Sequence, residues 1–188
     1  MIKIIALLSM FLSPAARAGQ AAPDAGAEKY VCDGAYFTAM VPSDWEKEDE
    51  ITIGRQEKQY GVDLYAPGKP PAAVISLIYF GPDHARFKTA EKYIATQRET
   101  RDRIKGEKSG KVSSTVVNNR YAKTFDKLSY EMVPPYSPKA VKVEMLERFV
   151  VIPAKQGFYS LSFKAPKGEA RRYLAAFEKI LKTFKPAR

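Results

Sequence analysis

The C-terminal segment constrains the fold of this chain more than any other part of the sequence. Its apolar side chains recur at spacings of i, i+1, i+4, i+7, i+8 and i+11. They belong to Tyr173, Leu174, Phe177, Ile180, Leu181 and Phe184. Those spacings place all of them on one side of an α-helix, and another layer must cover that side. We therefore expect residues 169–184 to form a helix laid across a β-sheet, in preference to one lying on a membrane surface.

The preceding sequence contains the strands of such a sheet. Tyr60, Val62 and Leu64 occupy alternate positions, which is the period of a half-buried strand. Residues 72–80 are almost continuously apolar, as a central strand requires. The strand candidates are 35–41, 50–56, 59–66, 72–80, 111–117, 120–132, 142–152 and 157–165. Turn-forming residues at 118–119 and 154–157 predict two hairpins.

A second helix is expected at residues 89–104, with Thr89 as its N-terminal cap and Glu91 in its first turn. Its apolar stripe is thin, which indicates a surface position. The order of strands, helix, strands and helix predicts an α+β fold around a mostly antiparallel sheet of about six or seven strands. A length of 188 residues suits one domain, which we place at residues 34–186.

The N-terminus has the three parts of a secretory signal at residues 1–18. Lys3 precedes a short apolar run, Pro14 ends that run, and small residues follow before Gly19. We expect cleavage between Ala18 and Gly19, a flexible lead-in at residues 19–33, and a soluble exported protein, placed in the periplasm. The alternative, a retained N-terminal anchor, is disfavoured because the apolar run is far shorter than the roughly 20 residues that a spanning helix needs.

The chain contains a single cysteine, Cys32. It cannot form an internal disulfide, and it lies too far beyond the apolar run to be a lipidation site. Three states stay open: a buried side chain, a free thiol, or half of an intermolecular bridge. Burial is favoured because unpaired cysteine is among the most buried residue types.

Two segments resemble one known family. An apolar strand followed by Pro, two residues and Trp occupies positions 36–45 (YFTAMVPSDW), and a strand at 157–166 (GFYSLSFKAP) precedes the closing helix. Both are similar to PsbP-like domains, a family whose architecture is also used by exported proteins of the DcrB type. The resemblance spans about residues 34–186 and implies an α/β/α sandwich with a central antiparallel sheet. It carries over no site residue, and a photosystem role does not follow from fold alone.

The sequence provides little for catalysis. The only histidine, His84, lies in a predicted turn, where we expect it to be exposed or to cap the following backbone. No G-x-S-x-G or H-E-x-x-H motif and no glycine-rich phosphate loop occurs. The acids Glu46, Glu48, Asp49 and Glu50 are interpreted as a solvated turn, with weak Ca²⁺ binding as the alternative. We therefore assign no catalytic, metal-binding or cofactor-binding residue, and a hydrolase with an unrecognised carboxylate site is only a remote alternative.

The positive charge is concentrated in the second half of the chain. The net charge is +10; residues 19–104 hold 11 bases and 14 acids, whereas residues 105–188 hold 18 bases and 7 acids. An exported protein meets little nucleic acid, so an anionic envelope surface or polymer is the expected partner of these bases. The candidate contacts near the closing helix are Lys164, Lys167, Arg171, Arg172, Lys179, Lys182 and Lys185.

Residues 132–138 contain three prolines, which predicts an irregular loop because proline interrupts sheet pairing. Pro134, Pro135 and Tyr136 are the candidate protein contact within it, since loops carry function and tyrosine is favoured at interfaces. The sequence as a whole indicates an exported, non-catalytic accessory or binding protein, with its partner and oligomeric state open. The alternative is binding of anionic envelope surfaces or polymers by the basic half.

Overall fold

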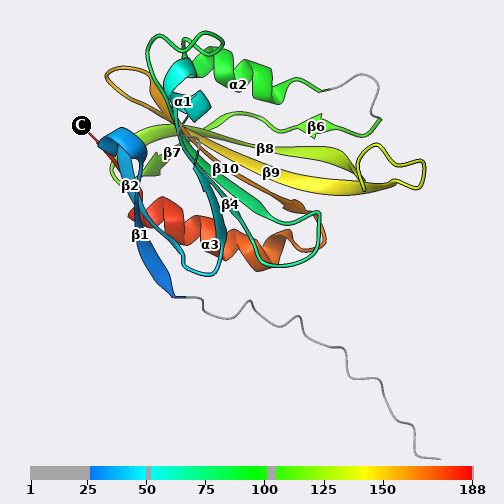
Figure 1. The fold of residues 1–188 in the computed structure, drawn as a ribbon. Helices are drawn as coiled ribbons and strands as arrows, with labels where there is room; N and C mark the ends of the chain where they lie inside the picture. The colour runs from blue at the N-terminus through cyan, green and yellow to red at the C-terminus, as the bar shows by residue number, and fades with distance from the viewer. Residues whose placement is uncertain (1–25, 50–51, 101–104, 188) are drawn as a thin grey trace, which may run out of the picture.

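The computed structural model describes residues 26–49, 52–100 and 105–187 (Figure 1). A central eight-stranded sheet runs in the order β3-β4-β5-β10-β9-β8-β6, and β7 also pairs with β8. Its strands are β3 (Glu46–Asp49), β4 (Gln59–Tyr65), β5 (Val74–Phe80), β6 (Lys108–Ser109), β7 (Ser113–Val117), β8 (Arg120–Val133), β9 (Val141–Pro153) and β10 (Phe158–Pro166). Every pairing between these strands is antiparallel.

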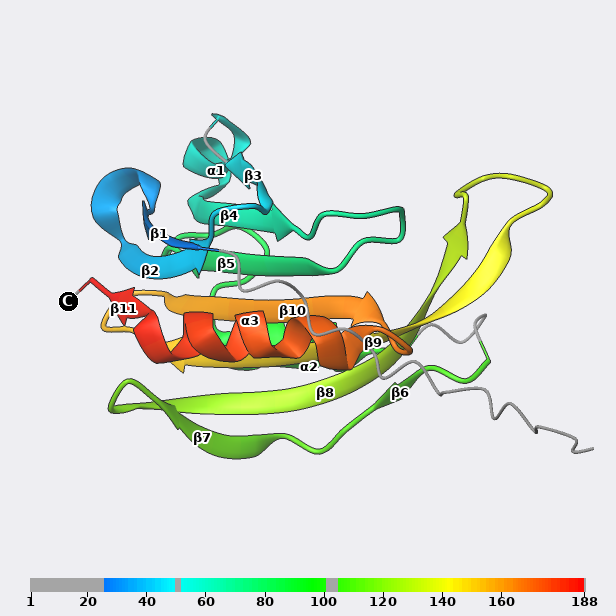
Figure 2. The same ribbon diagram turned by 90° about the horizontal axis from the view of Figure 1, so that it is seen from below.

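Helices cover both faces of this sheet. The helices are α1 (Thr52–Glu57), α2 (Ala90–Arg98) and α3 (Ala170–Thr183). A second sheet joins β1 (Ala27–Val31), β2 (Phe37–Pro42) and β11 (Lys185–Pro186). Figures 1 and 2 show α3 on one face of the central sheet and α2 on the other. The expected α/β/α sandwich, with a mostly antiparallel sheet and a C-terminal amphipathic helix, is confirmed.

Each face of the sheet has its own apolar core. On the α3 face, Phe177 is fully buried, with its ring 5.9 Å from the ring of Phe163 on β10. On the α2 face, Tyr93 packs with an aromatic group that includes Phe80 and Phe158. Residues 149–152 of β9 contribute alternately to the two cores, so this strand is buried on both faces. That double burial accounts for its continuous apolar sequence.

Both expected hairpin turns are confirmed. Asn118 and Asn119 have φ angles of 48° and 64°, which this residue type tolerates better than most, and they join β7 to β8. Gly157 has a φ of 70°, and a Cβ there would lie 1.9 Å from the carbonyl oxygen of Phe80. Only glycine fits this close approach of turn and strand.

Two predicted elements differ from the structure. The segment 50–56 was expected to be a strand, but Thr52–Glu57 forms helix α1. The guanidinium of Arg55 donates two hydrogen bonds, of 2.8 and 3.0 Å, to the carboxylate of Asp33 and so ties α1 to a distant segment. Such a long-range contact overrides the strand preference of β-branched residues.

The helix expected at 89–104 is shorter than predicted. Thr89 does cap it, with its hydroxyl oxygen accepting a hydrogen bond from the Lys92 amide, but α2 ends at Arg98. The ammonium of Lys127 on β8 donates to the carbonyl oxygens of Gln97 and Glu99, at 3.0 and 2.7 Å. A cation from another strand thus satisfies the carbonyls at the helix end, where a positive charge is favourable. Residues 101–104 lie outside the described residues.

Two polar segments expected to be irregular pair as strands. Ala27–Val31, placed in the lead-in, forms β1 against β2, while residues 19–25 and the signal at 1–18 lie outside the described residues. Glu46–Asp49, expected to be a solvated turn, forms the exposed strand β3 against β4. Short edge strands rich in charge lack an apolar alternation, which is why both were missed. The central sheet exceeds six or seven strands because it contains β3 and the two-residue strand β6.

Cys32 is buried at the end of β1, as favoured from its residue type. Burial, together with the neighbouring Asp33 carboxylate, raises the pKa of its thiol to about 12. We expect iodoacetamide at pH 8 to leave Cys32 unmodified in the folded protein and to alkylate it fully in urea, as measured by mass spectrometry. Rapid alkylation without urea would show that this end of the domain is open.

Candidate interaction surfaces

His84 is buried in the loop between β5 and α2. Its Nδ1 accepts hydrogen bonds from the amides of Phe87 and Arg86, at 2.9 and 3.2 Å, and its ring lies 5.0 Å from the ring of Phe80. The expected capping role is therefore confirmed, whereas exposure is not. Burial lowers the pKa of the imidazole, which favours the neutral ring that this geometry requires.

This burial predicts a pH dependence of stability. Below about pH 6.5 the unfolded chain protonates His84, while the folded chain resists protonation, so the free energy of unfolding falls as the pH drops toward the lowered pKa. The variant His84→Asn keeps a side-chain acceptor at this position but does not titrate. Between pH 7.5 and pH 5.5, the free energy of unfolding measured in urea is expected to fall less for His84→Asn than for the natural chain. An equal fall for both proteins would show that His84 is not the source of this pH dependence.

Two of the bases predicted to contact an anionic partner form ion pairs within the chain. The ammonium of Lys164 lies 2.5 Å from the Glu131 carboxylate, and that of Lys167 lies 2.7 Å from Glu144. These ion pairs join the end of β10 and the turn after it to the long strands β8 and β9. The pair with Lys167 lowers the pKa of Glu144 and raises that of the lysine. Both lysines therefore neutralise acids of the same chain.

The remaining predicted bases lie on or just after α3. Arg171, Arg172, Lys179 and Lys182 are exposed on the helix, opposite its apolar stripe, and Lys185 is exposed on β11. The guanidinium of Arg172 also lies 5.2 Å from the ring centre of Tyr173. The outer face of α3 thus presents a row of positive charge, as its sequence predicts.

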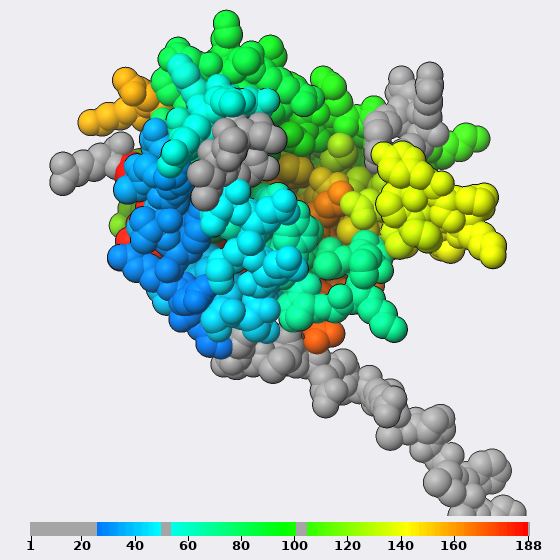
Figure 3. Space-filling model, in the orientation of Figure 1, coloured from blue at the N-terminus to red at the C-terminus, as the bar shows by residue number. Residues whose placement is uncertain are grey.

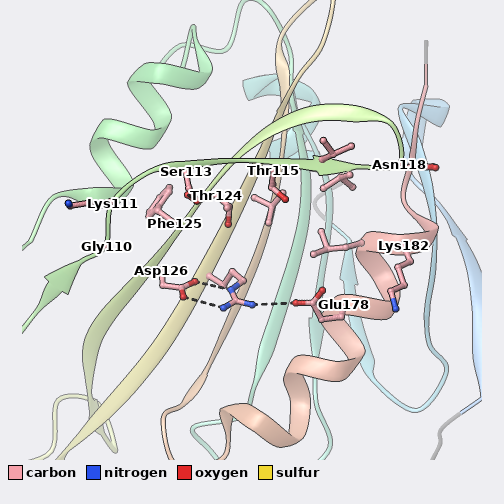
Figure 4. Close-up of a pocket in the computed structure, with 15 residues that line it drawn as sticks. Gly110, Lys111, Ser113, Thr115, Asn118, Thr124, Phe125, Asp126, Glu178 and Lys182 are labelled. Carbon is pink, nitrogen blue, oxygen red and sulfur yellow. Dashed lines mark hydrogen bonds and ion pairs between the residues drawn. The ribbon is translucent and has the colours of Figure 1, made fainter.

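A hollow of about 660 Å³ lies between β7 and α3 (Figure 4). Arg148 crosses its floor, with two guanidinium nitrogens 2.8 and 3.2 Å from Asp126 and a third 3.3 Å from Glu178 on α3. The hydrogen bonds with Asp126 raise the pKa of Arg148 above its ordinary value. The guanidinium thus pairs with both carboxylates, and these contacts link β8, β9 and α3.

The β8–β9 hairpin extends beyond the sheet as a two-stranded arm. β10 pairs with β9 only from Met145 to Pro153, whereas β8 pairs with β9 as far as Val133 and Val141. The outer pairs therefore have no third strand beside β9. Figure 2 shows this arm leaving the sheet, and Figure 3 shows its yellow end standing clear of the molecular body.

Apolar side chains gather at the end of this arm. Met132 is 51% exposed, Val141 is 65% exposed, and Tyr136 is fully exposed. Pro134 and Pro135 in the connecting loop are exposed as well. We call Met132, Pro134, Pro135, Tyr136 and Val141 the arm tip. The three loop residues were predicted from the prolines, whereas the exposure of the two strand residues follows from the projection of the arm.

Tyr136 has an unusual backbone. Its φ is 59°, in the left-handed region that aromatic residues seldom adopt. This conformation costs on the order of 1 kcal/mol relative to the ordinary helical or extended regions. Because the ring of Tyr136 is fully exposed, no burial of the ring offsets this backbone strain in the free protein. Such a residue is a reason to look for a binding role.

The charge around the arm tip is positive. Lys164 and Lys167 neutralise Glu131 and Glu144 at the base of the arm. Lys139 and Lys142 are exposed beside the tip, and within the described residues neither forms an ion pair. The ammonium of Lys142 donates to the Lys105 carbonyl oxygen at 2.8 Å, and it lies 3.8 Å from the ring centre of Tyr130.

The architecture is similar to that of a solved protein. The solution structure of cyanobacterial PsbP (CyanoP) from Synechocystis sp. PCC 6803 superposes with a TM-score of 0.52 at 11% identity, covering 94% of this chain and 99% of that chain. The fold is PsbP-like. The resemblance expected from the two sequence segments is thereby confirmed for the PsbP-like fold, at an identity that speaks to fold alone.

Two other solved structures superpose less well. LpqN, described as involved in cell envelope biogenesis of Mycobacterium tuberculosis, has a TM-score of 0.46 at 16% identity, covering 81% of this chain and 83% of that chain. A protein of Bacteroides thetaiotaomicron has a TM-score of 0.42 at 15% identity, covering 85% of this chain and 48% of that chain. No protein-family model and no curated protein matches the sequence.

Two further observations concern the described residues. Their His, Cys, Asp and Glu side chains form no group of three or more suited to hold a metal ion. None of their helices combines the length and the apolar character needed to cross a bilayer. The two candidate surfaces are the arm tip and the exposed bases of α3 (Arg171, Arg172, Lys179 and Lys182), which we call the α3 base row.

Proposed function

We propose that this chain is an exported, non-catalytic accessory protein that binds a component of the cell envelope through the arm tip. The observation that carries the proposal is the position of its exposed apolar side chains. Three exposed apolar residues mark the end of a projecting two-stranded arm: Met132 and Val141, which the register places on opposite faces of the arm, and Tyr136 in the loop between them. A free arm of this kind gives the domain no core packing, so its apolar end is best explained as a contact surface.

The polar groups support a binding role over catalysis. The His84 Nδ1 is occupied by backbone amides, and Arg148 is held by two carboxylates across the floor of the hollow. A catalytic acid or base must reach a substrate. The Nε2 of His84 has no hydrogen-bond partner, but the residue is only 2% exposed, so burial keeps it from one. The export part of the proposal is supported by the signal-like residues 1–18, and it predicts a mature chain that begins at Gly19.

Shortening the arm tests the proposal. Glu131 and Val143 are directly opposite in the β8–β9 register, so a two-residue Asn-Gly turn can replace residues 132–142. The natural chain is expected to sediment with the envelope fraction of its source cells, and the shortened chain is expected to stay in the soluble fraction. Export is followed in parallel by the mass of the mature protein.

The shortened chain needs a folding control, because loss of binding must not reflect loss of structure. The removed residues lie outside the region of β9 that pairs with β10. Its urea unfolding midpoint should therefore match that of the natural chain. Undiminished sedimentation of a folded, shortened chain would overturn the proposed function.

A second candidate function is binding of an anionic envelope polymer by the α3 base row. It is favoured by the exposure of Arg171, Arg172, Lys179 and Lys182 on one helix. Charge reversal by Arg171→Glu with Arg172→Glu should then abolish envelope sedimentation while the arm stays intact. Loss of binding on shortening the arm, but not on charge reversal, decides in favour of the arm tip.

A further inference from the structure

We infer that the arm tip binds the surface of a bilayer containing anionic lipid. This inference rests on the proposed function, because it names the class of envelope component that the arm tip contacts. The arm tip presents exposed apolar side chains and a tyrosine at one extremity of the molecule, and the exposed lysines Lys139 and Lys142 lie beside it. Those are the elements of a segment that enters the boundary between lipid headgroups and acyl chains.

The shape of the arm tip favours a bilayer over a protein. It is convex and consists of a loop at residues 134–140 with the strand ends beside it. A standard protein interface covers about 800 Å² on each partner and draws on about 20–30 residues. The end of one hairpin is smaller than that. A bilayer needs only a few apolar side chains to enter its surface, and it deforms around a convex end.

The chemistry of the individual side chains fits the same surface. Tyrosine is enriched where membranes meet water, because its ring is apolar and its hydroxyl is polar. Met132 and Val141 flank the loop that carries Tyr136 and would enter beside it. Proline at positions 134 and 135 limits the backbone freedom that the loop loses on binding.

The charges supply the selectivity for anionic lipid. Lys139 and Lys142 lie just behind the apolar side chains, where an ammonium reaches the phosphate level while its stem stays apolar. Glu131 and Glu144, the acids of the arm, are paired with Lys164 and Lys167 and so do not oppose a negative surface. The same pairs bring the segment before α3 to the base of the arm. Figure 2 shows the start of α3 toward this end of the molecule, and Arg171 and Arg172 belong to the first turn of that helix.

Vesicle binding tests the inference directly. The chain from Gly19 to Arg188 is titrated with vesicles of phosphatidylcholine alone and with vesicles that also contain phosphatidylglycerol. We expect binding to the second kind only, weakening as the ionic strength rises, because charges between surfaces are screened over about 10 Å at 0.1 M salt. Equal binding to both kinds would overturn the selectivity, and no binding to either would overturn the inference.

Matched variants locate the contact. Tyr136→Ser is expected to lower vesicle affinity about tenfold, through loss of the buried ring area. Lys139→Ala and Lys142→Ala are expected to lower it about fivefold each. Tyr121→Ser is the control, since Tyr121 is 84% exposed near the start of β8, whereas Tyr136 lies in the loop beyond the other end of that strand. An equal loss for Tyr121→Ser and Tyr136→Ser would overturn the assignment to the arm tip.

The two proposals fail in different ways. If the shortened chain leaves the envelope fraction but the natural chain binds no vesicle, the proposed function stands and the envelope component is a protein or polymer. If the shortened chain still sediments with the envelope, the proposed function itself is wrong, whatever the vesicles show. Vesicle binding that survives removal of residues 132–142 would overturn the bilayer inference alone.

Discussion

Replacing Trp45 by alanine is expected to lower the free energy of unfolding by about 3–5 kcal/mol, the range for removing a large aromatic side chain from a core. Trp45 is only 6% exposed, and its ring lies edge-on to Tyr173 of α3 with their centres 5.9 Å apart. The residue thus fixes α3 against the segment that leads into β3. Urea unfolding followed by circular dichroism measures the loss.

The control for this variant is an exposed aromatic residue of the same domain. Tyr121→Ala should change the free energy of unfolding by less than about 0.5 kcal/mol, as surface substitutions usually do. An unchanged unfolding midpoint for Trp45→Ala would mean that the tryptophan is exposed in solution. The packing of α3 described above would then be wrong.

Unlike Trp45→Ala, the variant Tyr136→Gly is not expected to lower the free energy of unfolding, but it is expected to weaken envelope binding strongly. Glycine accepts a φ of 59° without the steric cost that tyrosine bears there, and no ring packing is lost because Tyr136 is fully exposed. We expect the free energy of unfolding to stay the same or to rise by up to about 1 kcal/mol. Envelope retention should fall at least tenfold, as measured by sedimentation.

This pairing of outcomes separates a binding role from a structural one. A Tyr136→Gly protein that unfolds at markedly lower urea would show that the ring supports the loop, and the strained backbone would need no other explanation. A stable variant with undiminished envelope retention would remove Tyr136 from the contact surface. Urea unfolding and envelope sedimentation of the Tyr136→Gly protein together distinguish these outcomes.

Most of the sandwich was predictable from local pattern. The stripe that includes Phe177 and Ile180 identified α3, and the alternation in residues 59–66 identified β4, because burial on one face imposes a period that the sequence displays. The missed elements depend on distant partners. The hydrogen bonds between Arg55 and Asp33 support α1, and Lys127 satisfies the end of α2; neither contact leaves a local signal.

The candidate surface was only partly predictable. Prolines 134 and 135 marked the loop, because proline limits where strand pairing can continue. The projection of the arm was not predictable, since it depends on where β10 begins and stops pairing with β9. The ion pairs of Lys164 and Lys167 were likewise hidden, because their partners Glu131 and Glu144 are distant in sequence.

Photo-crosslinking tests most directly whether the arm tip is the contact surface. p-Benzoylphenylalanine replaces Tyr136 in one protein and Tyr121 in another, so that both probes are exposed aromatic residues near opposite ends of β8. After illumination of isolated envelopes, we expect adducts from position 136 and few from position 121, with lipid as the attached species. Equal adduct yields, or adducts from position 121 alone, would contradict the account.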